Sequence, residues 1–457
     1  MDFSAANTGL WNPIIQTGII AGLVLLANVI RRKISFVRDS LMPTAVLAGF
    51  ILLILRSTNV VPMSTTFLET ITYHAIALGF IALSLRTPEK NSEKGALLAS
   101  KNGALIVSTY LVQAIVGLVV SIGFAYTVMP TFFKAAGILL PMAYGQGPGQ
   151  ANNVGTTYQA LGMNGGRSFG LSLAASGYLC ACIVGVIYLN VLNRRGKLKR
   201  IRNKEEISGS VTLDAYQDEN EIPMSESVDK LSIQAALIAL VYLATYFLTQ
   251  GIVSGLQTIA PGVANMVGPL LWGFNFIIGS MLATGCRVFI SGLRKAQIMK
   301  RQYQNNYLLS RLSGLAFDFM TVAGIASINI EDLSGYLAPF LTMAIMGGVV
   351  TFIYLIYMCR VLYKGYEHEG FVSMFGMLTG TISSGVLLLR EIDPDLKTPA
   401  SNNLITGSSF GILFGAPVLL LVSFAAQPGM IWYAFGAVIL YLVALLLFIM
   451  LAGKRKE

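Results

Sequence analysis

The chain has 457 residues and a formal net charge of +10, with 54% hydrophobic but only 12% charged residues. About a quarter of the residues of an ordinary soluble domain are charged, so this composition and a mean hydropathy of +0.67 exclude a string of ordinary soluble domains. The positive charge does not indicate nucleic-acid binding, because it is distributed over alternate loops between apolar stretches.

Eleven stretches are candidates for membrane spans, since a helix needs about 20 apolar residues to cross the hydrocarbon. In chain order they run approximately over residues 12–30, 41–55, 67–85, 103–129, 168–192, 231–256, 265–285, 307–328, 336–363, 404–425 and 430–451. The second stretch is short, and we expect it to extend into its polar flanks. The sequence therefore predicts an all-α polytopic membrane protein with about 11 transmembrane helices.

The basic residues give the expected orientation. They gather around residues 31–38, 86–101, 194–204, 287–301 and 454–456. With the N-terminus outside, only Arg56, Lys134 and Arg167 of the 32 basic residues fall on the outer side. Because cytoplasmic loops carry the excess of lysine and arginine, we expect a multi-pass plasma-membrane protein. Its N-terminus would lie outside and its C-terminus in the cytoplasm.

A polar segment, residues 193–230, divides the chain and is expected to be a cytoplasmic linker. Five spans precede it, so the second half starts on the opposite side of the membrane and the halves form an inverted-topology repeat. We expect five helices in each repeat, over residues 1–192 and 231–425, followed by an extra helix and basic tail over 426–457. Supporting this, the strings Gly166-Arg167-Ser168-Phe169-Gly170-Leu171 and Gly407-Ser408-Ser409-Phe410-Gly411-Ile412 lie at corresponding positions.

The first repeat contains an irregular segment of about residues 135–166, in which three glycines and Pro148 interrupt an apolar run. Hydrocarbon tolerates non-helical backbone only where protein or a wet cavity surrounds it, so we expect a re-entrant loop. Helix ends at its tip would offer carbonyls to a cation and N–H groups to a carboxylate. The predicted substrate-binding residues are Gln146, Gly147, Gly149, Gln150 and Asn152, with Asn153 as an ion ligand.

The second repeat contains a similar segment of about residues 370–391, with Gly376, Gly380 and Gly385 among hydroxyl side chains. Hydroxyl and carbonyl oxygens suit sodium, whereas close helix packing is the alternative reason for such glycines. The predicted substrate-binding residues here are Thr379, Gly380, Thr381, Ser383 and Ser384, with Ser383 also an ion ligand. Arg390 either binds an anionic substrate or anchors the segment at the membrane surface.

Few charged groups lie within the spans. Asp318 is the clear intramembrane acid, and it is either an ion-binding residue or a structural partner of a neighbouring hydroxyl. His74 is more readily explained as a structural histidine than as a proton carrier. The sequence contains no nucleophilic triad, metal cluster or Walker loop, so we expect neither an enzyme nor a metal centre.

These residues resemble the bacterial sodium/glutamate symporter family over roughly residues 10–425. The first loop of that family often reads Gly-Gly-His-Gly-Thr-Gly-Ala, where this chain has Tyr144-Gly145-Gln146-Gly147-Pro148-Gly149-Gln150-Ala151. Gln146 thus replaces the histidine and Pro148 the threonine. The second loop lacks the family's dense Gly-x-Gly-x-Gly and keeps Gly376, Gly380 and Gly385. Citrate-type 2-hydroxycarboxylate carriers share a similar architecture and are the close alternative.

The resemblance implies sodium-coupled uptake of glutamate or a similar acidic amino acid by an elevator-like alternating-access movement of both loop tips. It also implies a homodimer in the lipid membrane, with sodium as the coupling ion and no nucleic-acid partner. A channel would use re-entrant loops as well, but its loops are usually alike and enter from one face. A membrane-embedded enzyme would need convergent acid and base groups. A secondary transporter is therefore the favoured interpretation.

Overall fold

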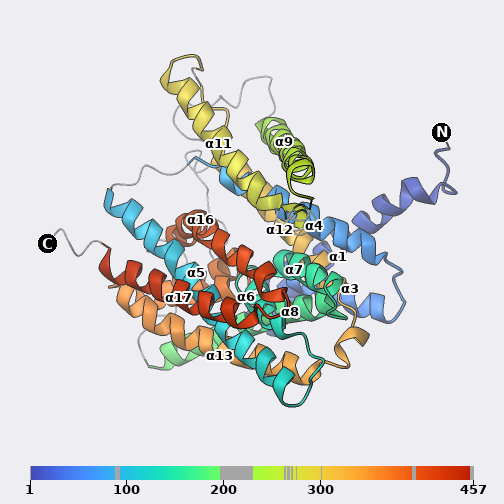
Figure 1. Cartoon of the computed structure of the whole chain (residues 1–457). Helices are drawn as coiled ribbons and strands as arrows, with labels where there is room; N and C mark the ends of the chain where they lie inside the picture. Colours follow the sequence, from blue (N-terminus) through green and yellow to red (C-terminus); the bar gives the residue numbers. More distant parts are fainter. Residues whose placement is uncertain are drawn as a thin grey trace. The chain divides into compact units, whose positions relative to one another are not determined.

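A computed structural model describes residues 2–87, 93–195, 230–261, 264, 268, 271–273, 275–299, 301–393 and 398–452 (Figure 1). All elements defined in these residues are helices. The helices of the N-terminal part are α1 (Thr8–Lys33), α2 (Ser35–Asp39), α3 (Thr44–Ser57), α4 (Thr65–Leu85), α5 (Glu93–Tyr126), η1 (Lys134–Ile138), α6 (Leu139–Tyr144), α7 (Pro148–Ala160) and α8 (Gly166–Arg194). Those of the C-terminal part are α9 (Lys230–Ile259), α11 (Asn275–Lys295), α12 (Asn306–Ala326), η3 (Glu331–Leu333), α13 (Leu337–Leu362), α14 (Glu367–Thr379), α15 (Ile382–Arg390), α16 (Ala400–Ala426) and α17 (Ile431–Leu451).

The predicted spans largely correspond to these helices. Within the described residues, nine helices are long and apolar enough to cross a membrane, namely α1, α4, α5, α8, α9, α11, α12, α13 and α17. A tenth, α16, is bent by 47° between its parts Ala400–Ser408 and Phe410–Ala426. The predicted span over 41–55 is α3, which has only 14 residues. By helix length and hydropathy, the chain is a multi-pass helical membrane protein.

The chain forms two compact units, and each draws on both predicted repeats. The first comprises residues 1–72, 91–200 and 321–457, and the second comprises 73–90 and 201–320. The predicted linker over 193–230 lies outside the described residues except at its two ends. The repeat boundaries remain a prediction, because compactness does not report on symmetry.

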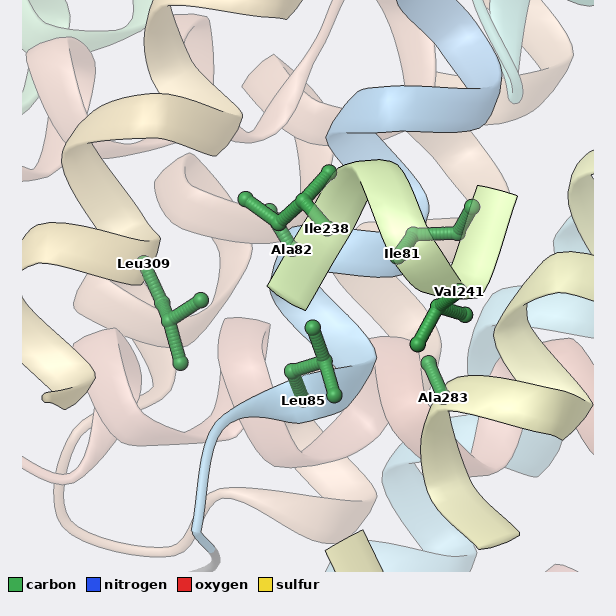
Figure 2. Close-up of a cluster of buried hydrophobic side chains, with 7 residues drawn as sticks. All are labelled: Ile81, Ala82, Leu85, Ile238, Val241, Ala283 and Leu309. Carbon is green, nitrogen blue, oxygen red and sulfur yellow. The ribbon is translucent and has the colours of Figure 1, made fainter. Parts of the chain in front are cut away.

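The second unit has an apolar core to which four helices contribute. Figure 2 shows its seven buried side chains, which come from α4, α9, α11 and α12: Ile81, Ala82, Leu85, Ile238, Val241, Ala283 and Leu309. Polar contacts at the end of this core tie the helices to their connections. For example, Gln234 donates to the Tyr303 carbonyl oxygen over 2.7 Å. The core and these contacts fix α9 against the other three helices.

The first unit is built around α5, which packs against α13, α16 and α17 (Figure 1). Small residues allow its close contacts: a Cβ atom on Gly117 would lie only 2.1 Å from the Gly137 carbonyl oxygen of η1. On Gly103 it would lie 2.4 Å from Cβ of Phe410 in α16. Such glycine-mediated approach is the usual packing mode of helices in membranes. It brings α5 directly against the segment that carries the first irregular stretch.

Both predicted irregular segments are helices interrupted by a short break. The first runs from α6 to α7 and the second from α14 to α15. The longer arms, α7 and α14, have 13 residues each, which is about 20 Å at 1.5 Å per residue. Since the hydrocarbon core is about 30 Å thick, no arm of either pair crosses it alone.

Candidate functional site

The first break lies at Gly145–Gly147, where the backbone leaves α6 and begins α7. Gly147 has φ +80° and ψ −173°, a conformation that only glycine adopts without strain. Pro148 is the first residue of α7, where its missing N–H and fixed φ are favourable. The predicted irregular run was therefore too long: Gly149, Gln150, Asn152 and Asn153 belong to α7.

The second break lies at Gly380 and Thr381, between the end of α14 and the start of α15. Thr381 is extended, with φ −143° and ψ 173°. The two arms fold back on each other, because a Cβ atom on Gly376 would lie 2.8 Å from Gly385 Cα. On Gly385 it would lie 2.4 Å from the Ser373 carbonyl oxygen. Gly376 and Gly385 thus permit the close packing of α14 with α15, and Gly380 marks the break itself.

The two breaks meet inside the first unit. A Cβ atom on Gly147 would lie 3.6 Å from the Gly380 carbonyl oxygen and 3.7 Å from Cγ2 of Thr381. Tyr178 of α8 completes the contact, with its hydroxyl 3.9 Å from the same position. Its Cδ1 atom lies 3.1 Å from the position of a Cβ on Gly380. Two segments more than 200 residues apart in the sequence therefore lie next to each other.

Four helix ends converge at this site. The C-termini of α6 and α14 carry partial negative charge, and the N-termini of α7 and α15 carry partial positive charge. No side chain caps the N-terminus of α7 or of α15 within the described residues, so backbone N–H groups remain there without an intrahelical acceptor. The arrangement can bind an anionic group at one pair of ends and a cation at the other.

Several buried polar atoms at or next to the breaks have no hydrogen-bond partner among the described residues. Ser384 Oγ is one, and it lies 2.8 Å from the position of a Cβ on Gly380. Both amide atoms of Gln150 and Oδ1 of Asn152 are others, although these side chains are only 1% and 5% exposed. An unsatisfied buried polar group is costly, at about 1–3 kcal/mol. A bound solute or ion would satisfy these groups.

Gln113 of α5 was not predicted, although it contacts the end of α14 at the second break. Its Nε2 atom donates to the Leu378 carbonyl oxygen of α14 and to Thr351 Oγ1 of α13, both over 2.9 Å. Its Oε1 atom is buried and has no partner in the described chain. The signal for it was available, because a glutamine inside a long apolar span indicates a functional or structural contact. Tyr178 had no comparable signal, since it is one of 19 tyrosines.

Other predicted residues occupy different places. Gln146 lies in the first break and is half-buried, Gly149 is buried in the first turn of α7, and Thr379 is buried at the end of α14. Arg390 is exposed at the last residue of α15, about 12 Å along the helix from the break. Asp318 is exposed on the part of α12 that belongs to the second unit. The side chain of Ser383 lies outside the described part of the structure.

Two further observations bear on the alternatives. His74 Nδ1 lies 2.7 Å from the Tyr242 hydroxyl, as the structural-histidine interpretation expects. Among the described residues, no three His, Cys, Asp or Glu side chains are placed to hold a metal ion.

Comparison of the sequence with protein-family models and with curated proteins finds no match to either.

Proposed function

We propose that the protein is a secondary active transporter whose solute and coupling ion bind where the two helix breaks meet. The observation that carries this proposal is the contact of Gly147 with Gly380. It brings together four helix ends and polar groups that have no hydrogen-bond partner among the residues described. Interrupted helices with opposed dipoles are the recurrent substrate and ion sites of transporters. Both breaks also carry the glycines that permit this close backbone approach.

The coupling ion we propose is sodium. The available ligands at the breaks are neutral oxygens: hydroxyls such as that of Ser384, amides such as that of Gln150, and carbonyls at the end of α14. Neutral oxygens can replace the water around sodium, whereas a proton carrier needs a group that titrates. If protons were the coupling ion instead, Asp318 would be the residue that binds them.

The solute we propose is glutamate or a similar acidic amino acid. The uncapped N-termini of α7 and α15 favour a carboxylate, and the resemblance to sodium/glutamate symporters suggests an amino acid rather than another acid. A 2-hydroxycarboxylate or dicarboxylate carrier would use the same helix ends and is the alternative.

The proposal includes the predicted topology. The two broken helices would be re-entrant loops of two inverted repeats, with the N-terminus outside and the C-terminus in the cytoplasm. Alternating access would come from an elevator-like movement of the part that carries both breaks, in a homodimer surrounded by lipid. An inward sodium gradient and an inside-negative potential would then drive accumulation, at about 2.3 kcal/mol per charge per 100 mV.

The test of the solute is uptake of labelled glutamate into proteoliposomes under an inward sodium gradient. We expect uptake above that of protein-free vesicles, with competition by unlabelled aspartate. Stronger competition by citrate than by aspartate would identify the hydroxycarboxylate alternative. If the vesicles take up neither acid, the proposal of an acidic solute is wrong.

A further inference from the structure

A polar cavity lies in the first unit and shares no lining residue with the helix breaks. Its volume is about 1060 Å³, and its walls come from the start of α1, the end of α3 and the turns near residues 57–64 and 328–331. Sites for small molecules commonly have volumes of about 300–1,000 Å³. The cavity is therefore large enough for a solute of amino-acid size together with water.

Arg56 is the only positively charged side chain among the described residues that line the cavity. Its Nη1 atom donates to the carbonyl oxygens of Ala326 and Ile328, and its Nη2 atom donates to Thr65 Oγ1. A guanidinium has five N–H donors, so two of them have no partner in the described chain. No carboxylate of that chain pairs with Arg56, since the acid Glu69 pairs instead with Arg167 at 2.7 Å.

With two N–H donors that have no partner in the described chain, Arg56 can bind an anion. Its orientation is fixed by the two backbone carbonyls. The acid Glu69, whose charge also acts on Arg56, forms its ion pair with Arg167. Arginine is the side chain best suited to carboxylates, because its planar donors can form paired, charge-assisted hydrogen bonds. The free donors of Arg56 thus offer one end of a carboxylate site.

Glu331 supplies the opposite charge. It is the only acidic side chain among the described lining residues and is exposed. Within the described chain, its carboxylate forms no ion pair. Its backbone N–H donates to Asn329 Oδ1 over 3.2 Å, and its backbone carbonyl accepts from the Ser334 N–H over 3.1 Å. A free carboxylate in the same cavity would repel a simple dicarboxylate, but it would attract an ammonium group.

Amide side chains complete the wall. Gln16 of α1 accepts a hydrogen bond from the Ser64 N–H over 3.0 Å, which leaves its own amide N–H groups as donors. Asn12 and Asn59 also line the cavity. Among the described lining residues, the charged side chains are one cation and one anion, neither in an ion pair within the described chain, and several neutral donors and acceptors accompany them. This set is the complement of a zwitterion.

We infer that this cavity is a second binding site for an α-amino acid, with a carboxylate on Arg56 and the ammonium on Glu331. The inference rests on the proposed function for its choice of an acidic amino acid, for the orientation of the site and for the presence of a further site at the helix breaks. Since Arg56 and Arg167 are among the few basic residues that the topology prediction assigns to the outer side, the site would take up solute from outside. It would load solute before transport.

The experiment is equilibrium dialysis of labelled glutamate with the full chain in lipid nanodiscs, for the wild type, Glu331→Gln and Arg56→Gln. We expect two sites per wild-type chain. Loss of one charge-assisted contact should raise the Kd of one site by about tenfold or more in either variant. Glu331→Gln is the safer variant, because Arg56 also bonds the end of α12 whereas the Glu331 carboxylate bonds no described residue.

Succinate, which has two carboxylates and no ammonium, is the control ligand. Glu331→Gln should weaken the binding of glutamate at this site, but the affinity for succinate should be unchanged or higher. Unchanged glutamate binding in Glu331→Gln, or an equal loss of both ligands, would overturn the inference. Failure of the proposed function has a different signature: no uptake of any acid, with binding that still depends on Glu331.

Discussion

Gln113 on α5 donates its side-chain amide to the carbonyl oxygen of Leu378, 2.9 Å away and one residue before α14 ends at the second helix break. The same nitrogen donates to Thr351 on α13. One buried amide therefore joins three helices at the point where the backbone becomes irregular. We infer that this tertiary contact, together with the glycine that follows, positions the break.

Replacing Gln113 by leucine should disturb the site more than the fold. The change leaves the Leu378 carbonyl without its side-chain donor, at a cost of about 1–3 kcal/mol. We expect a lower Tm in a thermal-unfolding measurement and at least a tenfold loss of glutamate uptake. Thr351→Val is the matched control, since it removes the other partner of the amide and spares the break. Equal uptake by wild type and Gln113→Leu would show that the contact does not serve transport.

Gly147→Ala tests the first break. The alanine has room, because its Cβ would lie 3.6 Å from the nearest atom, but φ at this position is +80°. The expected backbone strain of alanine at this φ is about 1–3 kcal/mol. A backbone change that relieves the strain would shift Pro148 and the N-terminus of α7. Uptake should fall strongly while the protein still inserts.

Gly162→Ala is the control for that substitution. Gly162 also has positive φ, +104°, but no atom lies within 4 Å of its Cβ position. The Gly162→Ala variant should lose about as much stability as Gly147→Ala and should keep the wild-type transport rate. If both variants transport normally, or both lose transport together, strain at Gly147 has no specific connection to the site.

The contact of α8 with the end of α14 is tested by Gly177→Ala. A Cβ atom on Gly177 would lie 2.4 Å from the Thr379 carbonyl oxygen, so the last turn of α14 must move. Overpacking of this kind costs about 1–3 kcal/mol, and uptake should fall. Gly123→Ala on α5 meets no atom within 4 Å and should be neutral in both thermal unfolding and uptake. The opposite ranking of the two variants would refute this role of Gly177.

The proposed orientation predicts that the N-terminus is accessible from outside. Ser4 is exposed before α1, so a cysteine there should react with an impermeant maleimide added to intact cells. The wild type, with its four cysteines, gives the background labelling. Reaction of Ser4→Cys only after the cells are permeabilised would reverse the assigned topology.

The sequence predicts the spans and the locations of both breaks, because apolar length and the Gly-Pro pair at 147–148 are local signals. It does not separate the glycines by role. Gly147 and Gly380 lie at the breaks, whereas Gly376 and Gly385 serve the packing of α14 on α15. That distinction depends on which backbone faces which neighbour. Tyr178 and Gln113 reach the site from other helices for the same reason, through contacts that no local pattern encodes.

The central claim is that a sodium ion and an acidic solute bind where Gly147 meets Gly380, next to the Ser384 hydroxyl, which has no hydrogen-bond partner in the described part of the chain. The most direct measurement is glutamate uptake into proteoliposomes under a sodium gradient at equal pH, compared with a pH gradient without sodium. We predict that the sodium gradient alone drives uptake and that Ser384→Ala raises the half-saturating sodium concentration by about tenfold, the loss expected for one ion ligand. Uptake that follows the pH gradient without sodium, is unchanged in Ser384→Ala and is lost in Asp318→Asn would contradict the account.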